Sequence, residues 1–173
     1  MTDLGTLADL ADLLSGAAVI GGAAFALIQL REYRRQRREN AAAELVKSFY
    51  NPEFARSVRL IRLLPDGCTA SELRAKGAEY EEAAILVSFA FETIGLLVFR
   101  RVTPFSIVEE LTGGLAVLMW RKLEQWERDV RVESAQASWS EWFQWLVERL
   151  LDSTRTRSQK PAYEAFSGWR PSS

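Results

Sequence analysis

Few side chains in this sequence are placed to perform chemistry, and the most conspicuous is one carboxylate. Glu92 is the single charged residue within the apolar segment 83–99. A carboxylate in such surroundings could act as an acid or base, or as a hydrogen-bonded or ion-paired internal anchor. No histidine, cysteine or second carboxylate is placed nearby to complete a catalytic set, so a buried polar anchor is the favoured interpretation. A small-ligand or substrate pocket around Glu92 is the alternative.

Other reactive or metal-binding residues are scarce. The 173 residues include no histidine, which removes the commonest metal ligand. Cys68 is the only cysteine, so no internal disulfide can form, and no adjacent basic residue would activate its thiol. Gly113-Gly114 lacks the lysine and the preceding strand of a phosphate-binding loop, and is expected to join two helices. The sequence therefore predicts no catalytic residue, no cofactor and no metal.

Tryptophan is unusually frequent. Among six tryptophans, Trp139, Trp142 and Trp145 recur at intervals of three along one predicted helix. Because Trp120 and Trp126 lie on the preceding helix, the favoured interpretation is a hydrophobic seam between the last two helices. The alternative is a partly exposed ridge that binds a partner protein or touches the membrane interface, where indole rings are favoured.

A long uncharged segment near the N-terminus determines where the rest of the chain is expected to lie. Residues 13–30 read LLSGAAVIGGAAFALIQL, with only Ser15 and Gln29 polar. As a helix they would rise by about 27 Å, close to the thickness of a hydrocarbon core. We expect a transmembrane helix here, preceded by a short acidic N-terminus over residues 1–12. The lack of Lys and Arg in that N-terminus argues against a signal peptide, and a helix buried in a soluble core or interface is the remaining alternative.

Five arginines follow this segment directly: Arg31, Arg34, Arg35, Arg37 and Arg38. Positive charge beside a span stays in the cytoplasm, which predicts a single-pass inner-membrane protein with its N-terminus outside. The arginines are also candidate contacts to anionic membrane lipid. Because the net charge is −1 and no groove-reading motif accompanies the cluster, nucleic acid is not an expected partner.

Small residues recur at helical spacing within the predicted span, at Ala17, Gly21 and Ala24. Such stripes let two helices approach closely in a bilayer. We therefore expect the span to associate with itself or with another membrane protein, and replacing Gly21 and Gly22 together by leucine to weaken that association.

The remaining sequence predicts an all-α fold. The span is expected to continue into a basic juxtamembrane helix over residues 31–51, followed by a compact helical bundle over residues 52–152. Capping signals stand at Asn51, Thr69 and Ser138. Within the bundle, helices are expected at residues 52–64, 69–77, 78–102, 106–111, 115–133 and 138–152. Residues 153–173 are expected to form a flexible tail, in which Tyr163, Phe166 and Trp169 are spaced like a docking peptide.

One ambiguity concerns residues 83–99, which are apolar enough to be a second span. Placing Glu92 at mid-membrane would cost about 2.5–3.5 kcal/mol, so a core helix is favoured. If this segment did cross the membrane, the last helices and the tail would lie outside.

With this layout, the chain resembles a group of uncharacterised bacterial proteins that pair one N-terminal span with a small cytoplasmic helical domain. The similar stretches are IQLREYRRQRR at 28–38, FETIGLLVFRR at 91–101, and LMWRKL at 118–123 leading to Val130-Arg131. The resemblance implies the architecture and supplies no activity. The function expected from the sequence is a non-catalytic, membrane-tethered interaction module, an accessory or assembly subunit that binds another membrane protein. The alternatives are a ligand sensor or enzyme with a pocket at Glu92, and a soluble helical regulator in which residues 13–30 form a buried interface.

Overall fold

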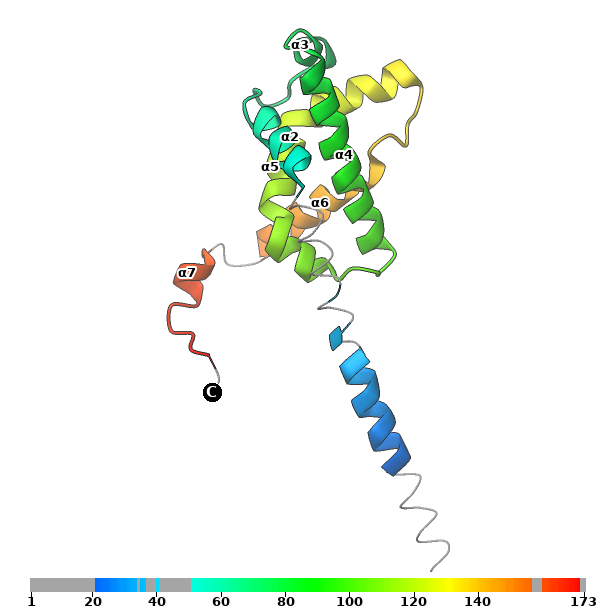
Figure 1. Cartoon of the computed structure of the whole chain (residues 1–173), viewed down its shortest axis with the longest axis vertical. Helices are drawn as coiled ribbons and strands as arrows, with labels where there is room; N and C mark the ends of the chain where they lie inside the picture. The colour runs from blue at the N-terminus through cyan, green and yellow to red at the C-terminus, as the bar shows by residue number, and fades with distance from the viewer. Residues whose placement is uncertain (1–20, 34, 37–39, 41–50, 157–159, 172–173) are drawn as a thin grey trace, which may run out of the picture. The chain divides into compact units, whose positions relative to one another are not determined.

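The computed structural model describes residues 21–33, 35–36, 40, 51–156 and 160–171 (Figure 1). The chain divides into two units, Met1–Ala43 and Glu44–Ser173. Throughout the described ranges the regular structure is helical and contains no strand. The all-α prediction is therefore confirmed.

In the first unit, residues 21–33 form a helix in which every residue is exposed. The exposed fractions of Phe25, Leu27 and Ile28 are 63%, 60% and 62%. The helix therefore covers the second half of the predicted span. Residues 13–20, and residues 41–50 of the predicted juxtamembrane helix, lie outside the described part.

The second unit begins with two short helices whose caps match the sequence prediction. Helix α2 (Pro52–Arg62) starts where Oδ1 of Asn51 accepts a hydrogen bond from the backbone N–H of Glu53 at 2.9 Å. Helix α3 (Ala70–Arg74) starts with a reciprocal capping box between Thr69 and Glu72. Both predicted caps are therefore confirmed. Each satisfies backbone N–H groups that a helix start leaves without partners.

The predicted helix break at Gly113-Gly114 is wrong. Helix α4 (Ala78–Phe99) is followed by a single helix α5 (Phe105–Ser134), which continues through both glycines. A mid-helix glycine costs only about 1 kcal/mol, which tertiary packing readily offsets. A Cβ atom on Gly113 would lie 3.1 Å from Cδ2 of Leu150, so this glycine gives room for a neighbouring side chain rather than a turn.

The last long helix, α6 (Glu141–Thr156), also differs from its prediction. It begins three residues after the predicted cap at Ser138, because Ser140 adopts a left-handed backbone with φ +52°. The backbone N–H of Glu141 donates to the carbonyl oxygen of Ser138 at 3.3 Å. Beyond α6, the segment predicted to be a tail contains one further helical turn, α7 (Ala162–Ala165).

Helix α4 is central to the second unit: it packs against α2, α5 and α6 (Figure 1). Its buried side chains include Ala84, Val87, Phe91, Ile94 and Val98. Within the described residues, α4 is the one helix long and apolar enough to cross a membrane by length and composition, and 44% of its most apolar stretch is buried inside the protein.

Candidate functional site

Glu92 connects two helices of the bundle. It lies half-buried on α4, and its Oε2 accepts a hydrogen bond from the backbone N–H of Phe143 at 2.7 Å. It also accepts one from the backbone N–H of Trp142. These two groups belong to the first turn of α6, where backbone N–H groups have no partner within their own helix. Glu92 therefore caps α6 from the neighbouring helix.

A second carboxylate, which the sequence analysis missed, is buried more deeply. Glu127 of α5 is 0% exposed. It accepts hydrogen bonds from Oγ of Ser88, from Nε1 of Trp139 at 2.6 Å, and from the hydroxyl of Ser140. Burial raises the pKa of Glu127, although the three donors oppose that rise.

Glu127 was missed because residues 121–131 are rich in charge and look like a solvated helix face. The signal that could have identified it is spacing. Glu127 follows the buried residues Trp120 and Leu123 by seven and four positions, which places it on the apolar stripe of α5.

Arg131 holds the loop between α5 and α6 from the other side. Its Nε donates to the backbone oxygen of Trp139 at 2.7 Å, and its Nη2 donates to that of Ser140 at 3.3 Å. Its Nη1 donates to Oε1 of Gln144 at 2.7 Å. Glu127 and Arg131 together hold the loop that precedes α6 through hydrogen bonds. We call this pair of residues and their hydrogen bonds the clamp.

A hollow of about 290 Å³ opens beside this clamp. Glu92, two aromatic rings and several hydroxyl and amide groups line it: Ser88, Phe89, Glu92, Gln136, Ser138, Trp139 and Ser140. The rings of Phe89 and Trp139 meet edge to face with their centroids 5.6 Å apart. Glu127 does not line the hollow itself, but it accepts hydrogen bonds from three residues that do: Ser88, Trp139 and Ser140.

The tryptophan ridge packs mainly against α4 rather than against the preceding helix. Trp142 and Trp145 contact Phe99, with ring centroids 4.4 Å and 5.8 Å apart. Trp139 contacts Phe89 of α4 and also Trp126 of α5, so its ring joins the two helices. All three tryptophans are half-buried. The ridge is therefore packed on one side and partly exposed on the other.

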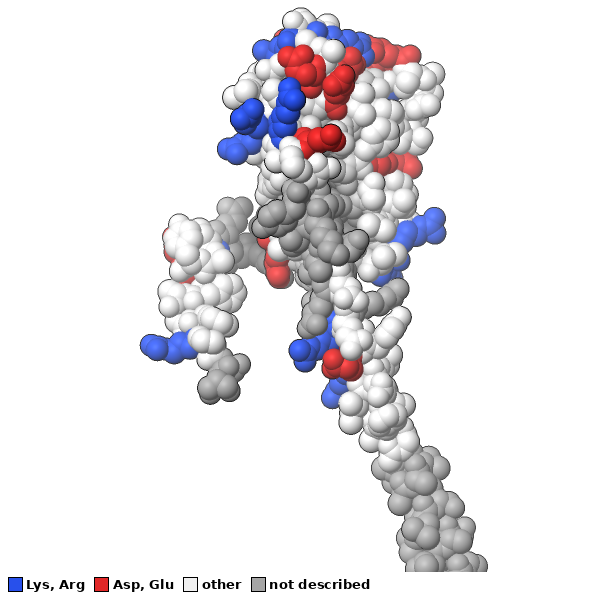
Figure 2. All heavy atoms as spheres, in the orientation of Figure 1, with Lys and Arg blue, Asp and Glu red and all other residues white. Residues whose placement is uncertain are grey.

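On the face shown in Figure 2, the charged side chains of the second unit gather mainly at the end where α3 lies, and much of the remaining surface is uncharged. The exposed apolar residues of α4 include Phe89 (55% exposed), Leu96 (36%) and Phe99 (49%). Together with Trp142 and Trp145, these residues form what we call the α4–α6 apolar surface.

Of the residues predicted to contact the membrane, part lies in the described helix of the first unit. Arg31 and Arg35 are exposed, as are Gly21 and Ala24 of the small-residue stripe. A Cβ atom on Gly21 would meet nothing within 4 Å. Arg34, Arg37, Arg38 and Ala17 lie outside the described residues.

The remaining candidates for reactive chemistry are the thiol of Cys68 and clusters of metal-binding side chains. Cys68 is 1% exposed, and burial raises the pKa of its thiol. In the described ranges, no three of the residue types Cys, Asp and Glu come together as a metal site. Comparison of the chain with protein families, curated proteins and solved structures finds no match.

Proposed function

We propose that this chain is a membrane-tethered interaction module, in which residues 13–30 cross the membrane and the helical bundle binds another membrane protein. The observation that carries the proposal is the helix at residues 21–30. It contains no charge, and its large apolar side chains Phe25, Leu27 and Ile28 are each at least 60% exposed. A helix that is apolar on all sides and exposed has its favourable environment in lipid.

The orientation follows from the arginines that succeed this helix. Arg31 and Arg35 are exposed, and the three further arginines continue the basic run in sequence. Because such a cluster is retained in the cytoplasm, we place the bundle there and the N-terminus outside the inner membrane.

Helix α4 is treated in this proposal as a core helix. Its neighbour α2 is only 11 residues long, too short to span a bilayer, and is amphipathic. The exposed face of α2 carries four charged residues, namely Glu53, Arg56, Arg59 and Arg62. Inserting α4 into lipid would either move these charged side chains of α2 into the bilayer or separate α2 from α4. Both changes cost free energy.

The α4–α6 apolar surface is the part of the bundle that we propose contacts the partner protein. Aromatic side chains that are half-exposed and held in place by ring contacts suit a binding surface, since they bury a large area and lose little conformational freedom. An accessory or assembly subunit needs a tether and such a surface, and the chain has candidates for both.

Alkaline carbonate extraction of membranes from cells expressing the full chain tests the tether. We expect the wild-type chain to stay with the membrane and a Phe25→Lys/Leu27→Lys variant to be released. A matched control, Leu63→Lys/Val132→Lys, changes exposed apolar residues of the bundle and should remain bound. Release of the wild-type chain into the carbonate supernatant would refute the proposal.

A further inference from the structure

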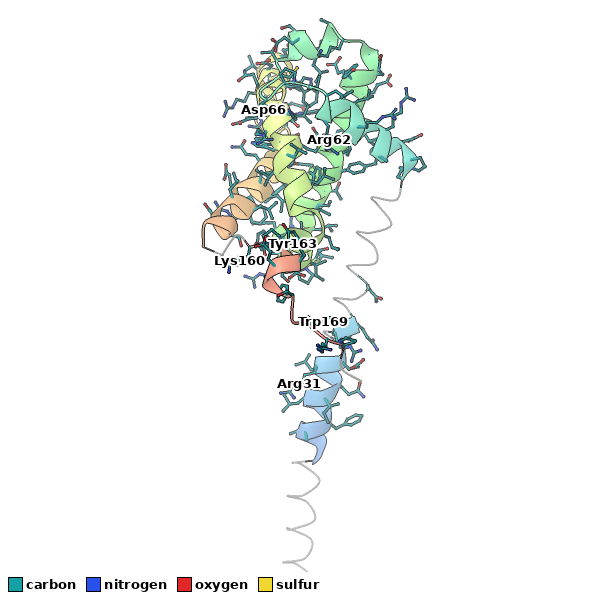
Figure 3. All side chains as sticks on the ribbon, turned by 90° about the vertical axis from the view of Figure 1, so that its left-hand side faces the viewer. Arg31, Arg62, Asp66, Lys160, Tyr163 and Trp169 are labelled. Carbon is teal, nitrogen blue, oxygen red and sulfur yellow. The ribbon has the colours of Figure 1, made fainter. Side chains whose placement is uncertain are left out.

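The segment after α6 has a surface unlike that of the bundle. Residues 160–171 contain the single turn α7 and three large aromatic residues at intervals of three. Tyr163, Phe166 and Trp169 are 77%, 68% and 72% exposed, and Figure 3 shows Tyr163 and Trp169 on this segment. No residue of α7 is buried.

Basic residues surround these aromatic residues in the sequence. Lys160 precedes them, Arg170 follows them, and Arg155 and Arg157 lie just upstream. Glu164 is the only acidic residue between 155 and 171, so this stretch holds four positive charges against one negative charge. The bundle as a whole has the opposite balance, because residues 51–154 hold 12 basic and 16 acidic residues.

This combination matches the chemistry of an anionic membrane surface. Tyrosine and tryptophan rings favour the headgroup region, where the ring meets apolar chains and its polar atom meets water. Each basic residue near an anionic bilayer adds about 1 kcal/mol of attraction. A helix of one turn is marginal in water, so a surface that accepts its aromatic side chains would also stabilise α7.

We propose that residues 160–171 form an interfacial anchor that binds anionic phospholipid. The inference rests on the proposed tether, because a chain already held at the membrane presents this segment at a high effective concentration. The bundle is then attached to the bilayer through both of its ends. Two attachments restrict the orientations of the bundle, and therefore the direction in which the α4–α6 apolar surface is presented.

The test uses the full chain with Cys68→Ala and Ser167→Cys, labelled at position 167 with the fluorophore NBD and reconstituted in nanodiscs. Ser167 is exposed and lies between Phe166 and Trp169. In discs of phosphatidylcholine with phosphatidylglycerol, we expect doxyl-labelled lipid to quench the fluorophore at least about threefold more than in phosphatidylcholine alone. Added salt should reduce this quenching, since part of the attraction is electrostatic.

Two variants separate the segment from general effects. Tyr163→Ala/Phe166→Ala/Trp169→Ala should abolish the quenching, whereas Leu63→Ala/Val132→Ala, on the exposed surface of the bundle, should leave it unchanged. Co-elution of the chain with nanodiscs reports the N-terminal tether independently. If the chain does not co-elute, the same quenching is measured with anionic vesicles added to it.

Absence of quenching in anionic bilayers would overturn the proposal and favour a docking peptide for a protein, while co-elution would leave the tether standing. Quenching that persists in the triple alanine variant would also overturn it.

Discussion

The predicted span at residues 13–30 and helix α4 are both apolar enough in sequence to be considered as membrane spans, but their described parts differ in burial. Every residue of the helix at residues 21–33 is exposed. Helix α4, in contrast, has neighbouring helices that cover Val87, Phe91 and Ile94. Even the one charged residue within its apolar stretch 83–99 has a structural role, because Glu92 caps α6. The difference shows that apolar composition alone does not decide whether a helix is buried in the fold. Val87, Phe91 and Ile94 are buried because α2, α5 and α6 pack against α4.

The largest expected effect tests the packing of α4 against α6. A Cβ atom on Gly95 of α4 would overlap the backbone carbonyl oxygen of Trp142, a group that cannot move aside without shifting α6. We expect Gly95→Ala to lower the free energy of unfolding by about 2–3 kcal/mol, measured by urea denaturation of the purified chain.

The matched control is another mid-helix glycine, Gly114 of α5, around which an added Cβ would meet nothing within 4 Å. Gly114→Ala should raise the free energy of unfolding by about 0.5–1 kcal/mol, because alanine favours helix. Equal effects of the two substitutions would mean that α4 and α6 are not packed as described.

The next effect concerns the buried carboxylate of α5. Glu127→Ala leaves Nε1 of Trp139 and the hydroxyl of Ser88 without their acceptor, and should lower the free energy of unfolding by about 2 kcal/mol. Trp139→Phe removes one donor and keeps most of the packing, so it should cost less.

Glu127 also predicts a dependence on pH. Its pKa is raised in the folded chain, so the folded state holds this proton more tightly than the unfolded state does. Its contribution to stability is therefore greatest below the ordinary glutamate pKa of 4.5 and is lost as the pH rises through the raised value. The side chain of Glu127→Gln cannot ionise. As the pH rises through this window, the urea midpoint of the wild type should therefore fall relative to that of the variant. Parallel midpoints at all pH values would contradict the assignment.

A smaller effect is expected at the cap of α6. Glu92→Ala removes the acceptor for the backbone N–H of Phe143, at a cost of about 1 kcal/mol. Amide hydrogen exchange at Trp142 and Phe143 should accelerate selectively. The neighbouring exposed residue provides a control, since Thr93→Ala should leave exchange at these two amides unchanged.

The smallest effect on stability is expected in the first unit. Gly21→Leu/Gly22→Leu should leave the unfolding of the bundle unchanged and weaken crosslinking between chains in membranes, because bulky side chains keep two helices apart. Phe25→Leu is the conservative control. Crosslinking that is as strong in the double variant as in the wild type would refute a contact through these glycines.

The sequence analysis identified two of its three predicted caps, while α6 begins three residues after the third, at Ser138. The caps at Asn51 and Thr69 join residues two and three positions apart, so their spacing alone predicts them. It failed where distant residues decide: Gly113-Gly114 continues a helix because α6 packs there, and Glu127 is buried among partners up to 39 positions away. The partner of Glu92 was equally out of reach, since Phe143 lies 51 positions further along the chain.

Cysteine labelling on both sides of α4 tests the central claim most directly. In a Cys68→Ala background, Leu63→Cys precedes α4 and Val132→Cys follows it, at side chains that are 71% and 83% exposed in the wild-type chain. If residues 13–30 are the span and α4 is a core helix, a membrane-impermeant maleimide should label neither cysteine in intact spheroplasts and both in inverted vesicles. Labelling of position 132 from outside, with position 63 labelled only from inside, would show that α4 crosses the membrane and would contradict the account.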